Sequence, residues 1–163
     1  MLLEKTTSFM DQIFLELSNV GIFISNEEID HLCYRTSSDA HYQEMKTVFS
    51  NLGTCLVESE INGRMIATYK LNAPIKYKQF LIPMVEVPAP KKGQITTEGW
   101  EHFEIVTTLS FDEIMKLYPK AQFDLAGVHK LHNPELRVKL PSGSIKFHHQ
   151  TLESVIQTEL SLK

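Results

Sequence analysis

The spacing of apolar residues predicts a strand, a helix and three more strands in the first half of the chain. Residues 29–35 alternate between apolar and polar side chains as a strand does, and the next apolar residues recur at helical spacing until Gly53. Together these elements form a first module, residues 29–87. Its later parts are strands 54–60 and 65–71 joined by an Asn62-Gly63 turn, a loop at Pro74, and strand 79–87.

The second half repeats this order of elements. A turn-rich connector, residues 88–99, leads into a second module, residues 100–148. We expect its strands at 100–108, 128–131, 136–140 and 144–148, with a short helix from Ser110 or Asp112 to Pro119. Amphipathic helices are expected at 8–20 and 151–161. We therefore predict a single domain spanning residues 1–163, of class α+β, with two βαβββ modules and additional N- and C-terminal helices.

Each module opens with a strand that carries a histidine. His31 and His102 lie 71 residues apart, and each shares its strand face with a further polar residue: Arg35 in the first strand, and Glu104, two positions after His102, in the second. Arg35 lies four positions after His31, on the same side of the strand. The opposite faces are apolar and suited to a core. The repeat predicts a duplicated module with a paired site.

Composition and charge narrow the possible partners. The chain has 163 residues and a formal net charge of −4, and it contains no lysine and arginine stripe, so nucleic acid is not an expected partner. It has no apolar run long enough for a membrane span and no signal-peptide pattern at its start, from which we expect a cytoplasmic protein. Cys33 and Cys55 form no metal or redox motif and are expected to be reduced.

The order of elements resembles that of the vicinal oxygen chelate superfamily, which includes glyoxalase I, extradiol dioxygenases and bleomycin-resistance proteins. Local sequence is similar to one branch, the YecM family. The residues that carry this similarity are Asn62-Gly63-Arg64, the run EGWEHFEIV at 98–106, Asn133-Pro134 and the run IKFH at 145–148. The resemblance covers residues 9 to 160 and implies paired modules that form a U-shaped mixed sheet around a cup.

The resemblance also implies a metal site, because superfamily members that use metal take ligands from the first and fourth strands of each module. Mapped onto this chain, those ligands are His31, Glu86, His102 and His148. Such a set suits a divalent ion, namely zinc, nickel, cobalt, manganese or ferrous iron. The superfamily usually has a carboxylate at the last of these positions, where this chain has His148. A surface role for Glu86 is a nearly equal alternative, because strand alternation does not separate the two sides there.

Three functions remain open at this point. The first is a metal-dependent lyase, isomerase or dioxygenase that acts on a small oxygen-rich molecule, with Glu104 or Glu86 moving a proton and Arg35 binding an anionic group. The second is a metal-free protein of the same fold that binds a small molecule, and the third is an interaction protein that uses its N-terminal helix. Arg35 and Glu104 could instead form a structural ion pair. We expect a monomer or a homodimer.

Overall fold

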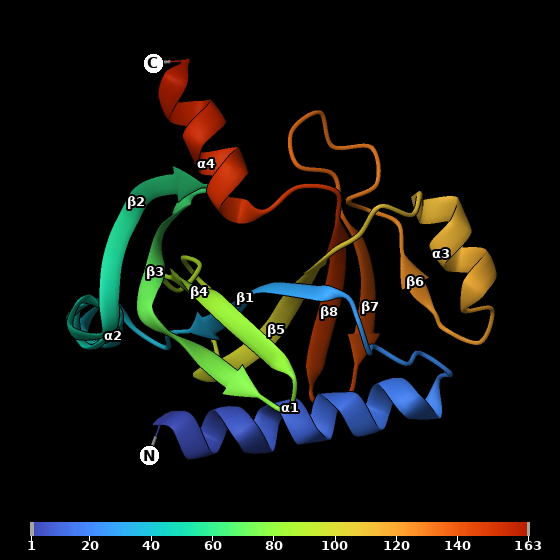
Figure 1. Ribbon diagram of the computed structural model, residues 1–163. Coiled ribbons are helices and arrows are strands. Elements are labelled where there is room, and N and C mark those ends of the chain that lie inside the picture. Colours follow the sequence, from blue (N-terminus) through green and yellow to red (C-terminus); the bar gives the residue numbers. More distant parts are fainter. Residues whose placement is uncertain (1, 163) are drawn as a thin grey trace. The chain divides into compact units, whose positions relative to one another are not determined.

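The computed structural model describes residues 2–162, which contain four helices and an eight-stranded mixed sheet (Figure 1). The chain folds into two compact units. Unit one comprises the chain up to Asp30 and from His102 onward, and unit two comprises His31–Glu101. The strand, helix and three-strand order occurs twice, which confirms the predicted α+β class with two βαβββ modules. None of the helices in residues 2–162 is both long enough and apolar enough to cross a membrane.

Unit two contains most of the first module. Its strands run in the order β2-β3-β4-β1, and β1 is parallel to β4 while the other neighbours are antiparallel. Helix α2 packs on this sheet through Tyr42, Met45 and Phe49, which are buried. The elements are β1 (Glu28–Arg35), α2 (Asp39–Leu52), β2 (Gly53–Ile61), β3 (Arg64–Tyr77) and β4 (Phe80–Pro88).

Local sequence explains both ends of α2. The Ser38 side chain accepts a hydrogen bond from the backbone N–H of His41, which satisfies one of the free donors of the first turn. Gly53 follows the helix as predicted, but its backbone is extended (φ −171°) and does not form the left-handed cap that glycine usually provides. Glycine is needed there because a Cβ atom would clash with the carbonyl oxygen of Lys70 on β3.

The hairpin between β2 and β3 has the predicted turn, since Asn62 and Gly63 both adopt positive φ (52° and 77°). The predicted loop at Pro74 is wrong, because β3 continues through this residue to Tyr77. The pairing of β3 with β4 shifts register between Lys70 and Ile75. A proline lacks a backbone N–H, and this irregularity is where a strand tolerates that loss.

Unit one contains most of the second module and both terminal helices. Its strands run in the order β5-β8-β7-β6, and β5 is parallel to β8. Ser110 and Glu113 form a capping box at the start of α3. The elements are α1 (Leu2–Asn19), β5 (Gly99–Val106), α3 (Phe111–Leu117), β6 (Phe123–Asp124), β7 (Leu136–Leu140), β8 (Gly143–His148) and α4 (Leu152–Ser161).

Two sequence predictions fail in unit one. The predicted strand at 128–131 is wrong: these residues form turns, and the strand that pairs with β7 is the two-residue β6 further upstream. The N-terminal helix starts at Leu2 and not at Ser8. Its apolar stripe does pack as predicted, because Met10, Ile13 and Leu17 are buried and the Phe14 ring stacks on Phe103 with centroids 5.8 Å apart.

Candidate functional site

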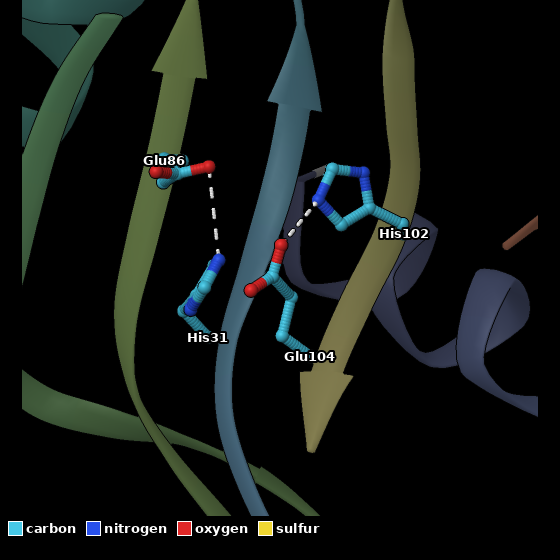
Figure 2. Close-up of side chains that lie close together, drawn as sticks. All are labelled: His31, Glu86, His102 and Glu104. Carbon is cyan, nitrogen blue, oxygen red and sulfur yellow. Dashed lines mark hydrogen bonds and ion pairs between the residues drawn. The ribbon is translucent and has the colours of Figure 1, made fainter. Parts of the chain in front are cut away.

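Unit two places His31 beside a carboxylate. His31 lies on β1 and Glu86 on the parallel neighbour β4, where the register pairs Cys33 with Glu86. The Nε2 atom of His31 is 3.7 Å from a carboxylate oxygen of Glu86, and the two side chains are 2% and 16% exposed. Figure 2 shows the imidazole and the carboxylate pointing toward each other. Glu86 thus lies beside His31 and is largely buried.

Two further residues of β1 lie on the same face as His31, because side chains alternate along a strand. Cys33 is buried, and its thiol lies 3.9 Å from a carboxylate oxygen of Glu101. The guanidinium Nη2 of Arg35 lies 2.5 Å from the other oxygen of Glu101. Arg35 also has a buried Nε atom that finds no hydrogen-bond acceptor among residues 2–162. Glu101 is a residue that the sequence reasoning missed.

Unit one places His102 beside a carboxylate two residues along the same strand. The Nε2 atom of His102 lies 3.2 Å from Glu104 Oε1, and both side chains are buried. Figure 2 shows this pair on β5. The ammonium of Lys146, on the neighbouring strand β8, lies 2.7 Å from the same Glu104 oxygen. Strand alternation predicts that Lys146 shares a face with His148.

His148 completes the surroundings of Glu104. Its Nε2 atom lies 2.6 Å from Glu104 Oε2, and its Nδ1 donates a hydrogen bond of 2.8 Å to Asn133 Oδ1. A second buried carboxylate, Glu135, lies 3.7 Å from the Lys146 ammonium. Burial by itself would raise the pKa of Glu135, but the ammonium groups of Lys146 and Lys130 outweigh this effect and hold the pKa below its ordinary value. Glu104 thus sits in a charged network inside unit one.

The two modules do not carry their acids at equivalent positions. His31 and His102 are each the fourth residue of their strands, β1 and β5. The register then pairs Cys33 with Glu86 in module one and Glu104 with Lys146 in module two. Lys146 is therefore the equivalent of Glu86, and His148 lies two residues beyond that position.

Each unit thus offers a histidine and a glutamate that could supply ligands to a metal ion.

Trp100, by contrast, packs edge-on against Tyr34 with ring centroids 5.1 Å apart. It belongs to an aromatic cluster with Phe49 and shapes the interior of unit two. Cys33 and Cys55 form no disulfide, as the sequence predicted.

Comparison with known proteins identifies relatives of the whole chain. Protein YecM of Escherichia coli K12 is 30% identical over 167 residues, which cover 90% of this chain and 86% of that protein. A solved structural-genomics structure, protein EC4020, superposes with a TM-score of 0.82 at 26% identity and covers 97% of this chain and 91% of that one. A hypothetical protein from Bacillus halodurans C-125 shares the fold, with a TM-score of 0.53 at 13% identity over 76% of this chain and 94% of that one. The family model described as YecM protein matches residues 1–125. The chain belongs to the YecM family.

Proposed function

We propose that the protein is a metal-dependent enzyme of the vicinal oxygen chelate superfamily that acts on a small oxygen-rich molecule. In this proposal each unit supplies a histidine and a glutamate as ligands of a divalent ion, His31 with Glu86 in unit two and His102 with Glu104 in unit one. The observation that carries the proposal is the repeat itself: each module sets a buried histidine at the same strand position and places a glutamate next to it.

The kinds of ligand atom fit a divalent ion. Imidazole nitrogen and carboxylate oxygen are the usual ligands of zinc and of the neighbouring first-row metals. The distances fit as well, because two atoms that each lie about 2.0–2.2 Å from one ion are roughly 3.4 Å apart in a tetrahedral site. The pairs His31–Glu86 and His102–Glu104, at 3.7 and 3.2 Å, come close to this value.

His148 fits a different role. Its 2.6 Å separation from Glu104 Oε2 is too short for two ligands of one ion. We therefore assign His148 to holding Glu104, together with Lys146 on the other oxygen. The sequence-based assignment differs, with His148 as a ligand and Glu104 as the proton carrier, and the experiment below distinguishes the two.

The remaining residues suggest the chemistry. A bound divalent ion would supply a Lewis acid that stabilises negative charge on a ligand oxygen. Arg35 would bind an anionic group of the substrate, because its side chain is 40% exposed while Nη2 is held by Glu101. A lyase, an isomerase and a dioxygenase would each use this arrangement.

One observation favours a second candidate, a metal-free protein that binds a small molecule. The Lys146 ammonium already neutralises Glu104 at 2.7 Å. A buried carboxylate with such a partner does not require a metal ion to balance its charge. In this alternative Arg35 and Glu104 are binding groups without turnover.

Elemental analysis of untagged protein and isothermal titration with zinc, nickel and manganese test the proposal. We expect one ion per chain, with binding abolished in His31→Ala and in His102→Ala and unchanged in His132→Ala, which alters an exposed histidine. His148→Ala should weaken binding by about 10–100-fold if His148 only holds Glu104, and should abolish it if His148 is a ligand. Wild-type protein that shows no saturable binding at neutral pH would favour the metal-free alternative.

A further inference from the structure

The loop between β6 and β7 is held in place although it contains no regular structure. The backbone N–H of Glu135 donates to the carbonyl oxygen of Gly127 over 3.0 Å, and that of Lys130 donates to the same oxygen over 3.3 Å. The Lys130 ammonium also pairs with the Glu135 carboxylate at 3.2 Å. A Cβ atom on Gly127 would clash with Glu135, so the two ends of the loop pack tightly. Residues inside the loop therefore have defined positions.

Asn133 in this loop has an unusual backbone conformation. Its φ is +47°, in the left-handed region, and it precedes Pro134. Proline disfavours helical conformations in the residue before it, so this backbone is costly. Asn62 has a similar φ of +52°, but the hairpin turn that it forms with Gly63 requires that value. The conformation of Asn133 needs another explanation.

The side chain of Asn133 supplies one. Its Oδ1 accepts the hydrogen bond from His148 Nδ1 at 2.8 Å. His148 is 4% exposed, and its other ring nitrogen faces Glu104 Oε2 at 2.6 Å. An acceptor at Nδ1 places a proton on that nitrogen and fixes the rotation of the ring, because a flipped ring would present carbon to both partners.

We propose that Asn133 is a positioning residue of the candidate site: it accepts the Nδ1–H of His148 and so fixes the orientation of the ring that lies against Glu104. Asn133 lies in the loop outside the sheet, and its left-handed backbone directs its side-chain amide toward the His148 ring. The role in catalysis rests on the proposed function, whereas the hydrogen bond and its effect on His148 do not. The inference also holds if Nε2 of His148 binds the ion directly, since ligand histidines commonly donate their second nitrogen to such an acceptor.

Nuclear magnetic resonance of ¹⁵N-labelled metal-free protein tests the hydrogen bond. We expect His148 Nδ1 to carry a slowly exchanging proton in the wild type and to lose this signal in Asn133→Gly, because glycine keeps the left-handed backbone and removes only the amide. Asn133→Asp, which retains an acceptor, should restore the signal. The matched control Asn62→Gly makes the same change in a hairpin turn and should leave the His148 spectrum unchanged.

Zinc titration of the same variants separates this inference from the proposed function. Asn133→Gly should weaken zinc binding by about 10–100-fold, while Asn62→Gly should bind as the wild type does. Protein that binds no zinc but shows the Asn133-dependent Nδ1 proton would overturn the metal proposal and support the positioning role. A wild-type His148 protonated only at Nε2, or a His148 spectrum that Asn133→Gly leaves unchanged, would overturn the positioning role whatever zinc does.

Discussion

The two units surround their histidines in different ways. In unit one, His102 belongs to a buried network in which Glu104 contacts Lys146 and His148 at 2.7 and 2.6 Å. In unit two, His31 faces Glu86 at 3.7 Å, and the interior behind the strand is aromatic, with Tyr34 against Trp100. The same strand position thus supports a network of compensated charge in one unit and a looser pair over an aromatic core in the other.

This difference has a consequence for stability. A buried charge depends on its partner, because losing the partner leaves the charge desolvated and uncompensated. An aromatic core depends on shape, and it is sensitive to changes of volume and backbone position. We therefore expect unit one to be most sensitive to changes of charge and unit two to be most sensitive to changes of packing.

The largest expected effect on stability comes from a change in the buried charge network around Glu104. Glu104→Gln should lower the free energy of unfolding of the metal-free protein by about 3–5 kcal/mol, because it leaves the Lys146 ammonium, itself 13% exposed, without its closest carboxylate. Glu86→Gln should cost less, since the Glu86 carboxylate lies 3.7 Å from His31 Nε2, a longer distance than those from Glu104 to Lys146 and His148. Urea unfolding at neutral pH measures both.

Lys146→Met provides the control for this prediction. If the pair is the source of the effect, Glu104→Gln should cost much less in the Lys146→Met background than in the wild type. Equal losses from Glu104→Gln and Glu86→Gln would contradict the contrast between the two units.

The second effect tests packing in unit two. Gly53→Ala should lower the free energy of unfolding by about 1–3 kcal/mol, because the new methyl group would meet the Lys70 carbonyl oxygen, which belongs to the backbone and cannot move aside. Gly63→Ala is the control: nothing lies within 4 Å of its Cβ position, so only the cost of its φ of +77° remains. Thermal unfolding compares the two variants, and a Gly53→Ala protein as stable as Gly63→Ala would contradict the packing argument.

How much of this could be predicted from the sequence depends on the range of the interactions. Alternation along β5 predicted that Phe103 and Ile105 face the core, and both are buried. The strand predicted at 128–131 failed because its apolar residues belong to a loop that Gly127 and Glu135 close through a contact eight residues apart. The loop partners Glu135 and Asn133 were missed for the same reason, since nothing in local periodicity reveals which loop residue meets a strand, and Glu101 on β5 was missed because periodicity does not reveal its partner on β1.

A smaller effect on the free energy of unfolding, measured as a function of pH and salt concentration, distinguishes one carboxylate of each unit. In unit one, burial tends to raise the pKa of Glu16, but hydrogen bonds from Gln12 and Ser142 outweigh it and hold the pKa below its ordinary value of 4.5. In unit two, the hydrogen bond from Lys46 is the main cause of the lowered pKa of Glu58. Each carboxylate has a folded-state pKa below its unfolded value, so each contributes stability above that value, and the contribution is lost as the pH falls below about 4.5.

Glu16→Gln and Glu58→Gln should each flatten the acid limb of the stability curve, by roughly 1 kcal/mol or less for each carboxylate. Salt should separate them. The partners of Glu16 are neutral, so its contribution should persist at 1 M sodium chloride, whereas the Lys46 pair of Glu58 should be screened. Urea unfolding between pH 3 and 7 at two salt concentrations measures this difference. Equal salt sensitivity would show that our assignment of causes is wrong.

The smallest expected effect on stability concerns Arg35, and it sharpens the comparison because Arg35 is a charged residue of unit two. The side chains of Arg35 and its ion-pair partner Glu101 are 40% and 22% exposed. Water therefore screens the pair, and Arg35→Ala should change the free energy of unfolding by about 0–1 kcal/mol. The same variant should weaken an anionic ligand by about 2–5 kcal/mol if Arg35 pairs with a buried charge of that ligand. Thermal unfolding with and without candidate carboxylates and phosphonates measures both quantities. If Arg35→Ala destabilises the ligand-free protein as much as Glu104→Gln does, Arg35 is a structural residue and unit two depends on charge as unit one does.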